Sequence, residues 1–138
     1  MADIDLKPSV IATGAKTSSV PDTVAGLCDA FAHLLSPFVE VVVHDWEKQE
    51  VCYLSGNISD RNLGDHSFID PIDMPLAPGQ IFGPYSKTNP DGRPVKSVSY
   101  IPPDHQRMLI CINFDVSKFQ SILSALTLLI EVAAPEEA

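Results

Sequence analysis

The sequence is poor in basic residues. Nine lysines and arginines stand against 18 aspartates and glutamates, which gives a formal net charge of −9 at pH 7. The basic residues are scattered singly, so they form no patch or stripe. Because this charge repels a phosphate backbone, we expect no direct binding to nucleic acid.

The sequence also lacks cysteine pairs and the common catalytic motifs. Cys28, Cys52 and Cys111 lie among apolar residues and have neither metal-ligand nor redox spacing, so we interpret them as buried thiols of a reducing compartment. No phosphate-binding glycine loop, nucleophile elbow or zinc-protease motif is present. We therefore expect no enzyme activity, no catalytic residue, no metal site and no cofactor.

No apolar run is long enough to span a membrane. The longest, residues 119–130, is shorter than the about 20 residues that a transmembrane helix needs, and it contains glutamine, serine and threonine. Residues 1–14 lack the basic and apolar segments of a secretory signal. The sequence therefore predicts a cytoplasmic protein that makes no membrane contact.

The chain length of 138 residues fits one domain. Residues 1–18 are polar and aperiodic and are predicted to form a flexible tail, which leaves 19–134 as a single domain. A helix is predicted from a capping Ser19 to about residue 36, just before a proline. A closing helix is predicted at about 115–132 from its apolar spacing.

Between the two helices, β-branched and apolar runs predict five short strands, at residues 38–46, 51–54, 81–87, 95–101 and 108–114. Tight turns between consecutive strands favour an antiparallel sheet. Residues 55–81 are interrupted by glycine and proline and allow only short helices, around 59–63 and 68–73. This order predicts an α+β fold that resembles the PAS arrangement: a five-stranded antiparallel sheet with helices on one side and flanking N- and C-terminal helices.

Five short motifs in the right order strengthen this resemblance; they lie at residues 40–45, 56–61, 85–88, 92–97 and 111–115. Together they resemble the YheO-like PAS domain, the sensory half of a family of bacterial transcriptional regulators, over about residues 25–130. A helix-turn-helix DNA-binding domain typically follows in that family, and these 138 residues contain none. The sequence departs from the family at Asp60, where a glycine is usual, and at Ser86, which is an extra residue.

The resemblance implies a ligand pocket between the sheet and the irregular middle segment. Its predicted polar lining consists of Asn57, Arg61, Tyr85, Ser97 and Asn113. Asn113 either orients a ligand or bonds the backbone of the middle segment, because a buried amide needs a partner. Arg61 either clamps a carboxylate ligand or forms a salt bridge to Asp60, Asp65 or Asp115.

Other polar residues in the strands have similar pairs of interpretations. Ser97 and Ser99 share one face of their strand and either contact a ligand or serve the structure. His44 and Asp45 are adjacent at a strand end and form either a carboxylate-supported histidine or a structural pair. Asp115 is predicted to cap the closing helix.

The leading functional hypothesis is a stand-alone PAS sensory domain that binds a small polar metabolite and signals through protein association in transcriptional regulation. Apolar stripes on the first and last helices predict a homodimer. The alternative is a ligand-free dimerisation or interaction module that modulates a full-length regulator, which would then be a separate protein partner. In that case the chain's own side chains fill the pocket.

Overall fold

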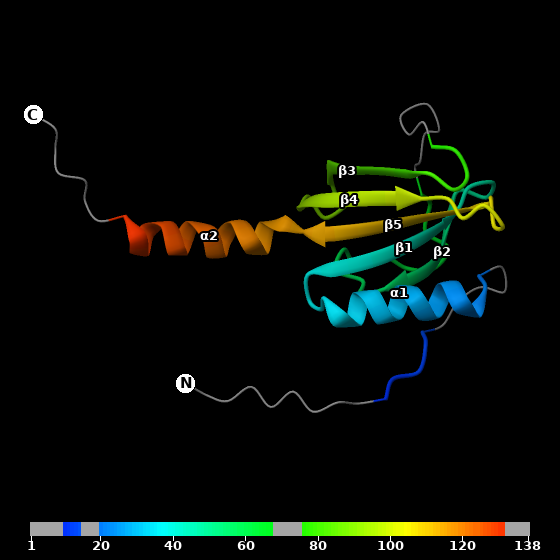
Figure 1. Ribbon diagram of the computed structural model, residues 1–138, viewed down its shortest axis with the longest axis horizontal. Helices are drawn as coiled ribbons and strands as arrows, with labels where there is room; N and C mark the ends of the chain where they lie inside the picture. The colour runs from blue at the N-terminus through cyan, green and yellow to red at the C-terminus, as the bar shows by residue number, and fades with distance from the viewer. Residues whose placement is uncertain (1–9, 15–19, 68–75, 132–138) are drawn as a thin grey trace, which may run out of the picture.

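A computed structural model of the chain describes residues 10–14, 20–67 and 76–131. They form a five-stranded antiparallel sheet with one helix along its side and a second helix that projects from it (Figure 1). The elements are α1 (Asp22–Leu34), β1 (Val39–Asp45), β2 (Glu50–Ser55), β3 (Ile81–Thr88), β4 (Pro94–Tyr100), β5 (Met108–Asp115) and α2 (Val116–Ile130).

The strands lie in the order β2-β1-β5-β4-β3, and every neighbouring pair is antiparallel. The predicted α+β fold is therefore confirmed. Each predicted strand boundary lies within one residue of the observed one. All seven residues of β1 are buried, because β1 lies between two strands and both of its faces are covered.

One face of the sheet packs against α1. The helix turns its small residues Ala25, Cys28 and Ala32 toward Val41 and Val43, and these side chains belong to one apolar cluster. Small residues allow the helix to approach the sheet closely. The helix begins at Asp22 with Pro21 in the capping position, so the predicted cap at Ser19 is wrong.

A cluster of hydrogen bonds around Asp29 joins α1 to β2. The Asp29 carboxylate accepts bonds from the Tyr53 hydroxyl at 2.5 Å, the Ser55 hydroxyl at 2.5 Å and the Gly14 amide at 2.9 Å. Burial favours the neutral carboxyl, but the bonds from Ser55 and Tyr53 outweigh it and lower the pKa of Asp29 below its ordinary value. Gly14 belongs to the predicted tail at 1–18, whose flexibility stays a prediction.

The opposite face of the sheet is covered by the segment after β2, which we call the covering loop (residues 56–67). It begins at Gly56, whose φ of +74° suits glycine and whose Cβ, if present, would lie 2.4 Å from the Val39 carbonyl oxygen. The predicted short helix at 59–63 is wrong: residues 60–62 have no regular structure and lie between two turns, with Asp60 at φ +56°. The other predicted short helix, at 68–73, lies outside the described residues.

The final helix, α2, is held only at its first turn. Asp115 caps it by accepting a bond from the Ser117 amide at 3.0 Å, which confirms the predicted cap. The Phe119 ring packs on Phe38 and Phe114, with centroids 4.7 and 5.0 Å away. Beyond this contact α2 extends away from the sheet (Figure 1), and none of its residues is buried. No helix within the described ranges is long and apolar enough to cross a membrane.

Candidate functional site

Four polar side chains lie in one row across the face beneath the covering loop. Glu40 of β1 pairs with Asn113 of β5, Asn113 with Ser97 of β4, and Ser97 with Tyr85 of β3. Directly opposed residues point to the same face, so this polar row (Glu40, Asn113, Ser97 and Tyr85) crosses four strands. Glu40, Asn113 and Ser97 are fully buried, and Tyr85 is half-buried.

The Glu40 carboxylate anchors the first end of the polar row. It accepts bonds from the backbone amide of Ser59 at 3.1 Å and from the Ser59 hydroxyl at 2.7 Å. It also accepts bonds from the side-chain amides of Asn89 at 3.3 Å and Asn113 at 2.9 Å. A fully buried carboxylate is stable only when such donors replace water. Glu40 thus joins the covering loop, the turn after β3 and strand β5.

Arg61 lies over the same carboxylate from the covering loop. Its Nε atom is 3.9 Å from Glu40 Oε1 and donates to the Ser59 hydroxyl at 2.8 Å, while Nη2 donates to the side-chain oxygen of Asn89 at 3.3 Å. The side chain is only 12% exposed. The sequence suggested a salt bridge from Arg61 to Asp60, Asp65 or Asp115, and this prediction is wrong for all three residues. The carboxylate beside Arg61 is Glu40, which the sequence analysis did not suggest.

Asn57 shapes the loop that presents Arg61. Its side-chain amide donates to the Arg61 carbonyl at 2.8 Å, and its side-chain oxygen accepts from the Arg61 backbone amide at 2.8 Å. Asn57 itself is exposed. These two bonds close the turn, and the ligand contact predicted for Asn57 stays a prediction.

Asn113 and Ser97 already have partners within the chain. The Ser97 hydroxyl donates to the Asn113 side-chain oxygen at 2.7 Å, and the Asn113 amide donates to Glu40. The structural partner predicted for Asn113, the backbone of the middle segment, is therefore wrong: a carboxylate from the next strand takes that place. Whether either residue also contacts a ligand stays a prediction.

The far end of the polar row is set by a bulge in β3. The pairing register shifts between Phe82 and Tyr85, and Gly83 lies there at φ +121° with its α-carbon too close to the Ser97 carbonyl for a Cβ. The bulge places the Tyr85 hydroxyl 2.8 Å from the Ser99 hydroxyl. Two hydroxyl groups thus meet beside the buried polar row.

Comparison with known proteins identifies the chain. Residues 16–131 match the family model of the YheO-like PAS domain. The chain belongs to the YheO-like PAS family. It is 36% identical over 105 residues to "Transcriptional regulator DauR" of Pseudomonas aeruginosa, a match that covers 74% of this chain and 50% of DauR. The chain thus spans about half the length of this relative. No solved structure matched it.

The departure from the YheO-like PAS pattern at Asp60 fits the backbone there. Its φ of +56° lies in the left-handed region, where the usual glycine has no steric cost and aspartate is among the better-tolerated alternatives. The conformation that the family's glycine favours is therefore kept in this chain. It turns the loop between Ser59 and Arg61, both of which contact Glu40.

His44 and Asp45 do not form the predicted pair. The His44 ring is buried on the covered face, with Nδ1 2.7 Å from the Ser67 hydroxyl of the loop. Burial, with smaller effects of the charges of Arg61 and Lys87, lowers the pKa of His44 to about 3, so the ring is neutral at pH 7.

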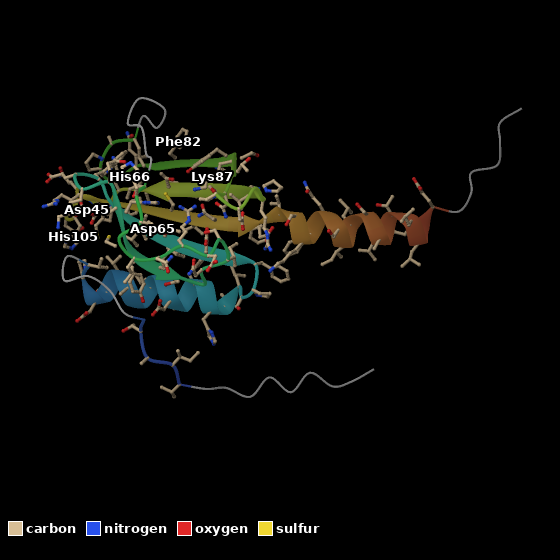
Figure 2. The ribbon with its side chains drawn as sticks, turned by 180° about the vertical axis from the view of Figure 1, so that it is seen from behind. Asp45, Asp65, His66, Phe82, Lys87 and His105 are labelled. Carbon is tan, nitrogen blue, oxygen red and sulfur yellow. The ribbon has the colours of Figure 1, made fainter. Side chains whose placement is uncertain are left out.

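Asp45 has separate partners at the end of the β1–β2 hairpin. It accepts bonds from the Glu47 and Lys48 amides at 3.0 Å and an Arg107 Nη2 atom at 3.2 Å. It borders a hollow of about 370 Å³ there. Figure 2 shows Asp45 beside His105, at the opposite end of the sheet from α2. No residue of the polar row lines this hollow.

The sequence interpretation missed two charged residues on the covered face, Glu40 and Lys87. Lys87, labelled in Figure 2, lies two residues after Tyr85 on β3, and the alternation of side chains along a strand therefore puts the two on one face. It is half-buried, and burial lowers the pKa of its ammonium group. A glutamate inside an apolar strand, and a lysine spaced two residues from a candidate tyrosine, were the available signals.

We predict that Glu40→Gln lowers the free energy of unfolding by about 3 kcal/mol. The NH2 group of the new glutamine would point at groups that are themselves hydrogen-bond donors, and Arg61 would lose its paired carboxylate. Urea denaturation measures the change. The matched control is Glu47→Gln, which neutralises a 67% exposed side chain paired with Arg107 and should change stability by less than about 0.5 kcal/mol. Equal effects of the two substitutions would contradict the role of Glu40.

Proposed function

We propose that this chain is the sensory domain of a transcriptional control system, and that it binds a small polar metabolite beneath the covering loop and signals through protein association. The observation that carries the proposal is the polar row, which places buried hydrogen-bonding groups where an apolar sheet face would be expected. A relative named as a transcriptional regulator, of which this chain spans about half, supports the regulatory part.

The chemistry of the polar row suits recognition better than stability. Buried polar groups cost free energy unless each is paired, whereas apolar residues of similar volume stabilise a core directly. Ligand sites use a few fixed polar groups on a rigid scaffold to orient a molecule. Here the scaffold is the sheet, and Arg61 comes from the loop, so a ligand held between them would couple loop position to occupancy. The proposal involves binding without turnover.

A second candidate, a ligand-free interaction module, is favoured by one observation. Glu40, Asn113 and Ser97 satisfy one another through bonds of 2.7 and 2.9 Å. A face whose groups are all paired internally can persist without any ligand. The chain would then act by associating with a full-length regulator.

A thermal-shift screen separates the two candidates. We expect at least one small polar metabolite, from a panel of amino acids, organic acids, sugars and nucleosides, to raise Tm with a saturable dose response; a ligand at 100 times its Kd adds about 2.7 kcal/mol of stability. Ser97→Ala should weaken that response, and Ser121→Ala, on exposed α2, should leave it unchanged. A panel without any saturable response would favour the interaction module.

The association surface that we propose for a homodimer is the apolar side of α2. Phe119, Ile122, Leu126 and Leu129 recur at intervals of three and four residues, the spacing of a coiled-coil seam, and are 42–81% exposed. Lys118 is the only charged residue of the helix. A helix of 15 residues is marginal alone in water, so pairing with the α2 of a second copy would stabilise it.

We expect sedimentation to show a dimer at micromolar concentration. Leu126→Glu should produce a monomer, because it places a charge in the seam. Gln120→Glu, which adds the same charge at an exposed position off the seam, should leave the dimer intact. A monomeric wild-type chain, or a dimer unaffected by Leu126→Glu, would contradict this surface.

A further inference from the structure

Two cations lie on the covered face, and together they have one carboxylate. Arg61 Nε is 3.9 Å from Glu40, and no hydrogen bond joins Arg61 Nη1 to another described residue. Lys87 is half-buried on β3, and within the described part of the chain its ammonium group has no carboxylate at salt-bridge distance and no hydrogen-bond acceptor. No buried side-chain nitrogen or oxygen atom of the described residues lacks a hydrogen-bond partner, so these two groups reach solvent and an anion can replace the water on them.

The other ionisable side chains here do not balance this charge. His44 is neutral, since burial lowers its pKa to about 3, and burial also raises the pKa of Cys111 and of Tyr85, which keeps both protonated. Asp60 and Asp65 of the covering loop are exposed to solvent, and Asp115 is paired with Arg93. The three enclosed charged groups of the described chain that remain, Glu40 at −1 and Arg61 and Lys87 at +1 each, sum to +1, so one small anion would balance them.

The size of that charge favours a carboxylate. A phosphate monoester carries about −1.5 to −2 charges at neutral pH and would overcompensate the site. A carboxylate carries one charge and matches the planar guanidinium fork of Arg61. The neutral hydroxyls of Tyr85 and Ser99, which lie 2.8 Å apart, are placed to bind the remainder of the ligand.

We propose that the ligand is a small organic acid or amino acid whose carboxylate binds between Arg61 and Lys87. This proposal rests on the proposed sensory function and adds the chemical class of the ligand. The proposal also explains the position of Lys87: without a paired anion its ammonium group lowers the stability of the ligand-free domain, and a bound anion would offset this cost.

The test compares Tm values of wild type, Lys87→Met and Lys96→Met with a panel of amino acids and small carboxylic acids, the primary amide of each, and phosphate monoesters of similar size. Methionine keeps the unbranched shape and most of the length of the lysine side chain, without its charge. Lys96 is the matched control because it is exposed and lies on the other face of β4. We expect at least one acid, and not its amide, to raise the wild-type Tm.

Lys87→Met should raise the ligand-free Tm by about 2–5 °C and weaken binding of that acid at least about tenfold, and Lys96→Met should do neither. An unchanged or lower ligand-free Tm for Lys87→Met would overturn the uncompensated charge. Amides or phosphate esters that bind as well as acids would overturn the carboxylate assignment and leave the sensory function standing. If nothing in this panel binds any variant, the carboxylate proposal fails; the sensory function fails only if the sugars and nucleosides of the wider panel also give no saturable response.

Discussion

The buried carboxylate of Glu40 is the interaction on which the covered face depends. It receives donors from three separate parts of the chain: Ser59 of the covering loop, Asn89 of the turn after β3, and Asn113 of β5. Arg61 then lies over it. Removing this carboxylate would leave the buried donors of Ser59, Asn89 and Asn113 without this acceptor and Arg61 without its paired charge.

The two faces of the sheet are therefore built on different physical principles. The α1 side is an apolar contact between small helix residues and valines, fastened at its edge by Asp29. The loop side is a hydrogen-bonded network around the buried Glu40 carboxylate, with Arg61 and Lys87 on the same face. A domain of this size gains enough from one apolar face to tolerate a polar one. The proposed recognition on the loop side and the proposed association through α2 both rest on this division.

Much of this architecture could be predicted from the sequence because it is local. Alternation within strands placed Ser97 and Asn113 on the covered face, and Asp115 was correctly assigned as a cap. The partners could not be predicted, because they depend on the register between strands. Arg61 pairs with Glu40, 21 positions earlier in the chain, and not with a nearby aspartate. The helix predicted at 59–63 failed because bonds from Ser59 to Glu40 outweigh the local preference.

Amide hydrogen exchange at Ser59, followed by NMR in the wild-type chain, tests the central interaction most directly. The Ser59 amide lies in a loop without regular structure and donates to Glu40 at 3.1 Å. If Glu40 holds the loop on the sheet, this amide exchanges as slowly as the amides of β1. Exchange at the rate of an unprotected loop amide would show that the carboxylate does not hold the loop, and the account of the covered face would be wrong.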